Sequence, residues 1–105
     1  MNKEIYGRLR KISERLKKEY HAEKVILYGS YATGTATKDS DIDLFIIAPT
    51  NERIFERMAT VRGIIRDLRI GLPVSPIVLT PEETESRKKK GDQFVREILQ
   101  SGVML

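Results

Sequence analysis

Apolar side chains recur every three or four positions in two long stretches of the chain. The first stripe lies within residues 3–20 and faces a basic opposite side, which predicts an amphipathic helix. The second stripe predicts a helix over residues 51–70 that ends at Gly71. The first stripe consists of Ile5, Leu9, Ile12, Leu16 and Tyr20, and the second of Ile54, Met58, Val61, Ile65 and Leu68.

Shorter apolar runs predict strands. Residues 25–28 form an unbroken apolar run that ends at Gly29, which is typical of a strand buried on both faces. Residues 41–48 form a second strand, and residues 72–79 form a third. Pro76 cannot donate a ladder hydrogen bond, so the third strand is expected at a sheet edge or with this gap facing away from a partner strand. In the second strand Asp41, Asp43, Phe45 and Ile47 share one face, while Ile42, Leu44 and Ile46 share the other.

The last third of the chain carries two helix-start signals. Thr80, Pro81 and Glu83 have the spacing of a capping box with proline in the first turn, which predicts a helix that stops near Gly91. Asp92 can cap a shorter helix, and residues 103–105 can form a final short strand. The predicted order is α-β-(short α)-β-α-β-α-α-β. We therefore expect one α/β domain over residues 1–105, a small mixed sheet with helices packed on it.

Composition narrows the possible functions. The chain has no cysteine, which excludes disulfides, thiolate metal sites and a thiol nucleophile. No apolar run approaches the roughly 20 residues that span a bilayer, and the first residues lack the apolar stretch of a signal peptide, so a cytoplasmic protein without membrane contact is expected. The net charge is +4, yet residues 29–50 carry Lys38 against Asp39, Asp41 and Asp43. An acidic cluster within a basic protein suggests a cation site near a surface that attracts phosphate.

The Gly29-Ser30 pair is the first candidate site. Glycine allows a ligand to approach the backbone closely, and the serine hydroxyl and the free amides of a helix start can donate to phosphate oxygens. By itself such a pair is more often just a turn.

The acidic pair changes that balance. Asp41 and Asp43 are two positions apart on a predicted strand, about 6.5 to 7 Å between Cα atoms, so their side chains can converge on one hard cation. Asp43 stands between Ile42 and Leu44, where aspartate is disfavoured and a buried charge needs a partner. An Asp-x-Asp pair beside a phosphate-binding turn predicts a metal–nucleotide site.

These motifs together resemble the signature of the minimal nucleotidyltransferases of the DNA polymerase β superfamily. The matching residues are Gly29, Ser30, Gly34 and the run Ser40-Asp41-Ile42-Asp43-Leu44. The resemblance implies a polymerase β palm-like fold, a nucleoside triphosphate held by Gly29 and Ser30, and Mg²⁺ ions, two of them in an active member, held by Asp41 and Asp43. It also implies transfer of a nucleoside monophosphate, with AMP from ATP as the favoured nucleotide.

One departure from the family pattern bears on activity. Active members usually carry a third carboxylate on the neighbouring strand, and residues 72–79 contain no acid. Ser75 is nearest to the expected position, and a serine offers neither negative charge nor a useful base. Asp67, Glu82 and Glu83 lie in predicted helices, from which a substitute would need a particular geometry.

Three hypotheses follow. The leading one is a nucleotidyltransferase whose acceptor hydroxyl lies on another polypeptide; the resemblance implies a helical HEPN-type partner in a toxin–antitoxin module, with this chain as antitoxin. The second is a nucleotide- and metal-binding module that acts by holding its partner. The third, a small nucleic-acid binder, draws only on the charge of +4. We also expect the helix face with Ile98 and Leu99 to be lightly covered and to mark an interface.

Overall fold

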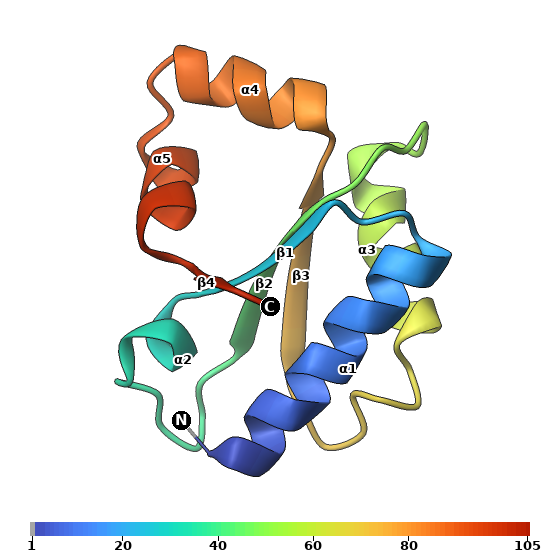
Figure 1. Ribbon diagram of the computed structural model, residues 1–105, viewed down its shortest axis with the longest axis vertical. Coiled ribbons are helices and arrows are strands. Elements are labelled where there is room, and N and C mark those ends of the chain that lie inside the picture. The colour runs from blue at the N-terminus through green and yellow to red at the C-terminus, as the bar shows by residue number, and fades with distance from the viewer. Residues whose placement is uncertain (1) are drawn as a thin grey trace.

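The computed structural model describes residues 2–105 and arranges them as a four-stranded mixed sheet with helices packed around it (Figure 1). The elements are α1 (Lys3–Glu19), β1 (Lys24–Tyr28), α2 (Ser30–Thr33), β2 (Ile42–Ile47), α3 (Ile54–Ile64), β3 (Val74–Leu79), α4 (Pro81–Lys89), α5 (Gln93–Ser101) and β4 (Val103–Met104). This order confirms the predicted α/β class and the predicted succession of elements.

The strand order β3-β2-β1-β4 brings three chain segments together at one end of the sheet. β1 pairs antiparallel with β2 and β4, whereas β2 and β3 run parallel. The end of β1 therefore meets the beginnings of β2 and β3. In this register Tyr28 stands opposite Asp43, and Asp43 stands opposite Ser75. β3 is an edge strand, as Pro76 predicts.

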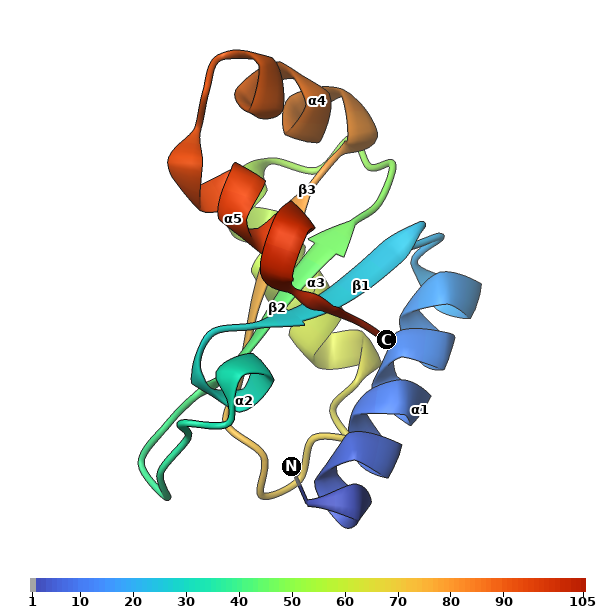
Figure 2. The same ribbon diagram turned by 60° about the vertical axis from the view of Figure 1, so that its left-hand side comes forward.

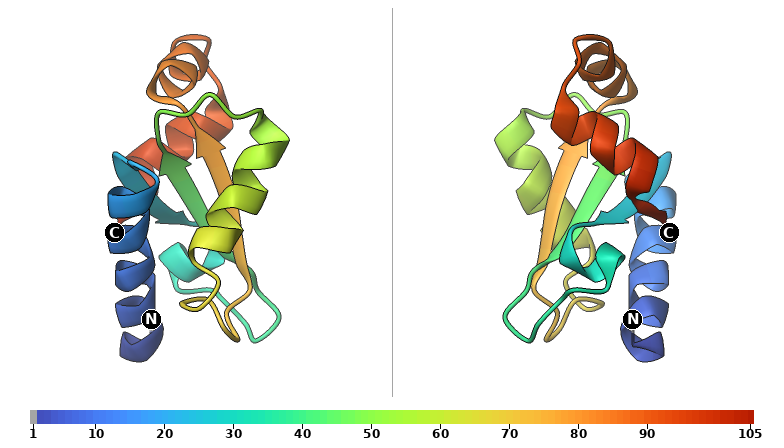
Figure 3. Two further views of the ribbon diagram at one scale, coloured as in Figure 1. Left: turned by 90° about the vertical axis from the view of Figure 1, so that its right-hand side faces the viewer. Right: turned by 90° about the vertical axis from the view of Figure 1, so that its left-hand side faces the viewer.

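Each face of the sheet has its own apolar cluster, as the alternation in β2 predicts. Ile42, Leu44 and Ile46 pack with α1 and α3, while Phe45 and Ile47 pack with α5. Figure 3 shows α1 and α3 before one face of the sheet and α5 across the other. Asp43 belongs to the face that α5 covers, because it alternates with Ile42 and Leu44 along the strand.

The second long helix is shorter than predicted. α3 runs over Ile54–Ile64, and residues 65–71 form turns instead of continuing the helix to residue 70. Arg8 of α1 donates hydrogen bonds to the carbonyls of Leu68, at 2.9 Å, and Ile70, at 2.5 Å. Side-chain hydrogen bonds from α1 thus hold the segment after α3, and the apolar spacing alone could not show this. Ile54, which the stripe includes, is 53% exposed.

The predicted caps at the C-terminal helices are confirmed. The Glu83 amide donates to Thr80 Oγ1 at 3.1 Å, and the Thr80 amide donates to Glu83 Oε1 at 2.8 Å, which completes the capping box. The Val95 amide donates to Asp92 Oδ1 at 3.1 Å at the start of α5.

The expectation of a lightly covered Ile98 is wrong. Ile98 is 3% exposed and packs in the cluster that includes Phe45 and Val95, since α5 lies directly on the sheet. Phe94 and Met104 are the more exposed apolar residues of this region. Within residues 2–105, no helix is both long and apolar enough to cross a membrane.

Candidate functional site

Gly29 and Asp43 form the closest contact of the site. Gly29 has φ +77°, and a Cβ atom built on it would lie 2.5 Å from Asp43 Oδ2. Only glycine combines this left-handed backbone with room for the neighbouring carboxylate. The glycine at the end of β1 thus lets the chain turn into α2 while the Asp43 carboxylate stays against the turn.

Ser30 begins the short helix α2, which lies beside the beginning of β2 (Figure 2). The amides of Ala32 and Thr33 donate to the Gly29 carbonyl, both at 3.1 Å, so intrahelical bonding starts with these two residues. The preceding amides, on Ser30 and Tyr31, are at the open end of the helix. The structure therefore places the start of α2 directly after Gly29, the residue that contacts the Asp43 carboxylate.

Asp41 precedes β2 rather than lying within it. The strand begins at Ile42, whose amide donates to the Pro73 carbonyl at 2.8 Å, one residue later than the predicted start. Asp41 is exposed and Asp43 is half-buried. Burial raises the pKa of the Asp43 carboxyl, and the negative charge of Asp41 raises this pKa further. The two negative charges thus influence each other, and a cation held by both carboxylates would relieve their repulsion.

Ser75 occupies the position opposite Asp43 on the neighbouring strand. Other acids lie elsewhere. Asp67 accepts a hydrogen bond from Arg15 on the far face of the sheet, and Glu83 follows the end of β3. The strand from Ser75 to Leu79 covers about 13 Å, so Glu82 and Glu83 are at the opposite end of the sheet from Asp43.

Glu83 is moreover engaged in a structural ion pair. Arg57, 5% exposed, donates to both Glu83 oxygens at 2.6 and 3.1 Å and to the Val78 carbonyl at 3.1 Å. The hydrogen bonds from Arg57 lower the pKa of Glu83 to about 2. This carboxylate joins α3, β3 and α4 and is not free to replace a third acid at Ser75.

Tyr28 is a site residue that the sequence analysis did not single out. It stands opposite Asp43 in the ladder, on the same face of the sheet, and its ring contacts Phe94 edge to face, with centroids 5.6 Å apart. Burial and the Asp43 charge raise the pKa of Tyr28 to about 12. Its position just before Gly29, in alternation with Ile26, was the available signal.

Comparison with known proteins agrees with this geometry. Residues 9–105 match the family described as "Nucleotidyltransferase domain". The chain belongs to this family. The domain is 40% identical over 62 residues to a protein of Methanocaldococcus jannaschii named "Putative protein adenylyltransferase MJ1305", a match that covers 56% of this chain and 42% of that protein. It thus spans less than half the length of that relative.

A solved structure shows the same fold. The domain superposes with a TM-score of 0.54 and 25% identity on a protein of Sulfolobus solfataricus described as a "putative nucleotidyltransferase", and the match covers 95% of this chain and 83% of the other. The polymerase β-like fold expected from the motif is thereby confirmed.

The donor atoms at this end of the sheet suit magnesium only in part. Within residues 2–105 no three His, Cys, Asp or Glu side chains gather into a group that would hold a metal ion. Mg²⁺ commonly uses one or two carboxylates together with substrate phosphates and water. The Asp41 and Asp43 carboxylates therefore fit a magnesium ion that a nucleoside triphosphate also coordinates.

Proposed function

We propose that the domain transfers a nucleoside monophosphate, AMP in the first instance, from a magnesium-bound nucleoside triphosphate to an acceptor hydroxyl. Membership of the nucleotidyltransferase family supports transfer in general. The observation that carries the proposal for this chain is the approach of Asp43 Oδ2 to Gly29, a carboxylate directly beside the turn that begins α2.

Each site residue at this end of the sheet has a distinct part in the proposed reaction. The Ser30 hydroxyl and the open end of α2 bind phosphate oxygens, and Asp41 and Asp43 hold the magnesium. The ion supplies neutralisation of the charge on the triphosphate. The acceptor oxygen forms a bond to the α-phosphorus, the bond from that phosphorus to the bridging oxygen breaks, and pyrophosphate leaves.

The hydroxyl proton needs an acceptor, and here the chain departs from active relatives. Ser75 stands opposite Asp43 but provides no base near neutral pH. The same observation favours a second candidate function, a module that binds magnesium and nucleotide and acts by holding its partner. The two functions share the triphosphate site and differ in whether transfer follows binding.

The acceptor belongs to the proposal as well. We place the acceptor hydroxyl on a second polypeptide. The resemblance to minimal nucleotidyltransferases suggests a helical HEPN-type protein in a toxin–antitoxin module. Co-purification with the protein encoded next to this chain, followed by size-exclusion chromatography, should give a stable complex; separate elution of the two chains would contradict it.

Calorimetry of ATP binding with and without Mg²⁺ tests the triphosphate site. We expect binding in the presence of the ion, a loss of at least about tenfold in affinity in Asp41→Asn and in Asp43→Asn, and no change in Asp39→Asn. Asp39 is an exposed carboxylate on the loop before β2, so it controls for a general loss of negative charge. Equal affinity without magnesium, or full affinity in both variants of the pair, would contradict the proposal.

A further inference from the structure

A pocket of about 330 Å³ adjoins the proposed triphosphate site. It lies between α2, α5 and the end of β1, and Gly29 belongs to its wall. Its volume is at the lower end of the range of about 300 to 1,000 Å³ that small-molecule sites occupy. The side chains that matter below are Tyr28, Ala32, Phe94, Glu97, Ile98 and Ser101.

Most of this wall is apolar and part of it is aromatic. Ile98 and Ala32 contribute aliphatic surface. The Phe94 ring is held edge to face against Tyr28, at an interplanar angle of 88°, and remains 48% exposed. A ring that is held against Tyr28 and is still half exposed offers surface for stacking. Such a ring suits a flat ligand, and every nucleobase has a flat face that can stack on an aromatic side chain.

Two polar side chains face the same space from α5. Glu97 and Ser101 are four residues apart on the helix and therefore neighbours on one side of it. The carboxylate accepts hydrogen bonds, and the hydroxyl can donate one. An amino group next to an unprotonated ring nitrogen complements this pair. Adenine and cytosine present that pattern, and adenine has the larger surface for stacking.

The pocket and the triphosphate site share Gly29, and Tyr28 stands opposite Asp43 in the ladder. A nucleotide bound by its phosphates at Ser30 and the acidic pair would therefore have this pocket within the length of the same ligand. Resting on the proposed function, we infer that the pocket between α2 and α5 binds the adenine base of the nucleotide, with Phe94 stacking on the base and Glu97 and Ser101 contacting its amino edge.

Two ligands separate the base from the phosphates. ATP carries both, whereas inorganic tripolyphosphate carries only the phosphates. In calorimetry with Mg²⁺, Ser101→Trp, which fills the pocket with a large side chain, should weaken ATP binding about tenfold and leave tripolyphosphate binding unchanged. Gln100→Trp places the same side chain one position away on α5, outside the pocket wall, and should change neither.

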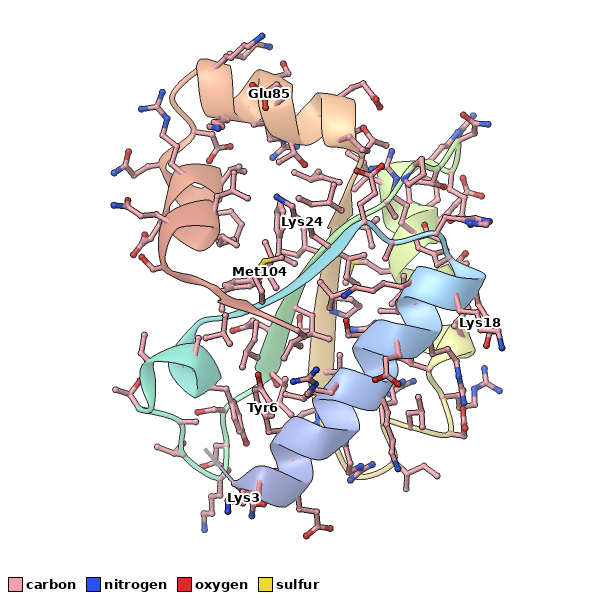
Figure 4. The ribbon with its side chains drawn as sticks, viewed as in Figure 1. Lys3, Tyr6, Lys18, Lys24, Glu85 and Met104 are labelled. Carbon is pink, nitrogen blue, oxygen red and sulfur yellow. The ribbon has the colours of Figure 1, made fainter. Side chains whose placement is uncertain are left out.

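A second variant tests the polar edge without altering the volume. The unmodified domain should prefer ATP to UTP, because uracil presents a carbonyl to Glu97 where adenine presents an amine. Glu97→Gln should reduce this preference at least about fivefold. Glu85, which Figure 4 labels, is an exposed carboxylate on α4, and Glu85→Gln should retain the preference for ATP over UTP.

The outcomes distinguish the pocket from the proposed function. Full ATP affinity in Ser101→Trp, equal weakening of ATP and tripolyphosphate, or an unchanged preference in Glu97→Gln would overturn the assignment of the base. A third outcome is that the domain binds ATP but not tripolyphosphate and that Ser101→Trp abolishes ATP binding. This result would support the base pocket and contradict the triphosphate site. Failure of the unmodified domain to bind either ligand would overturn both.

Discussion

Asp43 of β2 and Ser75 of β3 are direct partners in the parallel ladder. Neighbouring residues of a parallel pair direct their side chains to the same face of the sheet, so the Ser75 side chain is on the side of the Asp43 carboxylate. A carboxylate at position 75 would lie on the same side and at the same end of the sheet as Asp41 and Asp43. This relationship gives the sharpest distinction between an active transferase and a binding module.

Ser75→Asp should increase nucleotidyl transfer, because the new carboxylate supplies a base for the acceptor hydroxyl. A positioned general base contributes about 10²- to 10⁴-fold to a rate. The measurement is transfer of labelled AMP from ATP to the partner protein or to an RNA end. Ser75→Asn, of the same size as the aspartate and without charge, should have no such effect. Equal, measurable rates in the two variants would mean that the base lies elsewhere, whereas absence of transfer in Ser75→Asp would favour the binding module.

Gly29→Ala should reduce stability more than Gly34→Ala. Both glycines have positive φ, +77° and +79°. Alanine adds backbone strain of the order of 1 kcal/mol at Gly34, whose ψ is 15°, and more at Gly29, whose ψ of −153° is a conformation that essentially only glycine adopts. Only at Gly29 does the new methyl group also meet Asp43 Oδ2, while nothing lies within 4 Å at Gly34. Urea denaturation of the two variants measures the difference. Equal losses of unfolding free energy would show that Asp43 moves away without cost.

Glu83→Gln should destabilise the domain in a pH-dependent manner. The pKa of Glu83 is lowered to about 2 by Arg57, so this ion pair stabilises the folded state above pH 4.5 and the stabilisation disappears as the pH falls toward 2. At pH 7 we expect a loss of about 1.5–3 kcal/mol, the usual contribution of hydrogen bonds to a charged group. The difference from the unmodified domain should shrink steadily below pH 4.5.

The adjacent carboxylate provides the control for this experiment. Glu82 is exposed and has no ion-pair partner within residues 2–105, so Glu82→Gln should leave the unfolding free energy within about 0.5 kcal/mol of the unmodified value. A pH-independent loss in Glu83→Gln would instead indicate that the capping box with Thr80, rather than Arg57, accounts for its contribution.

Ser13→Ala should stabilise the domain. Ser13 is completely buried in α1, and its Oγ has no hydrogen-bond partner in the described chain. Removal of an unsatisfied buried hydroxyl recovers about 1 kcal/mol, and alanine adds a smaller gain from helix propensity. Ser86→Ala in α4, at an exposed position, should show the propensity gain alone. Equal gains in thermal denaturation would mean that the Ser13 hydroxyl is satisfied.

Regular patterns made most of the fold predictable. The alternation in β2 assigned Leu44 and Phe45 to opposite faces correctly, and Pro76 marked the edge strand, because both signals act through the backbone of a single element. The end of α3 was not predictable. The segment after it is held by hydrogen bonds from Arg8, more than fifty residues away in the chain, and side-chain spacing within α3 carries no trace of them.

The site divides in the same way. Gly29 and Asp43 stand out in the sequence, since each is unusual for its place at a strand end or inside a strand. The pairing of Asp43 with Ser75 requires the strand register, and the pocket wall requires the packing of α5 on the sheet. By contrast, the exposure of the outward side of α1, where Figure 4 labels Lys18, was predictable from the basic pattern of that helix alone.

The two apolar clusters on opposite sides of the sheet imply that the domain can open in parts. The larger cluster joins α1 and α3 to β1, β2 and β3, whereas α5 is attached by a smaller cluster around Val95 and Ile98. Amide hydrogens of α5 should therefore exchange with solvent through openings that leave those of β2 protected. A domain with α5 detached would retain Gly29, Asp41 and Asp43 on an intact sheet while losing Phe94 and Glu97. On the proposed function, such a domain would still bind phosphate groups but would no longer distinguish one base from another.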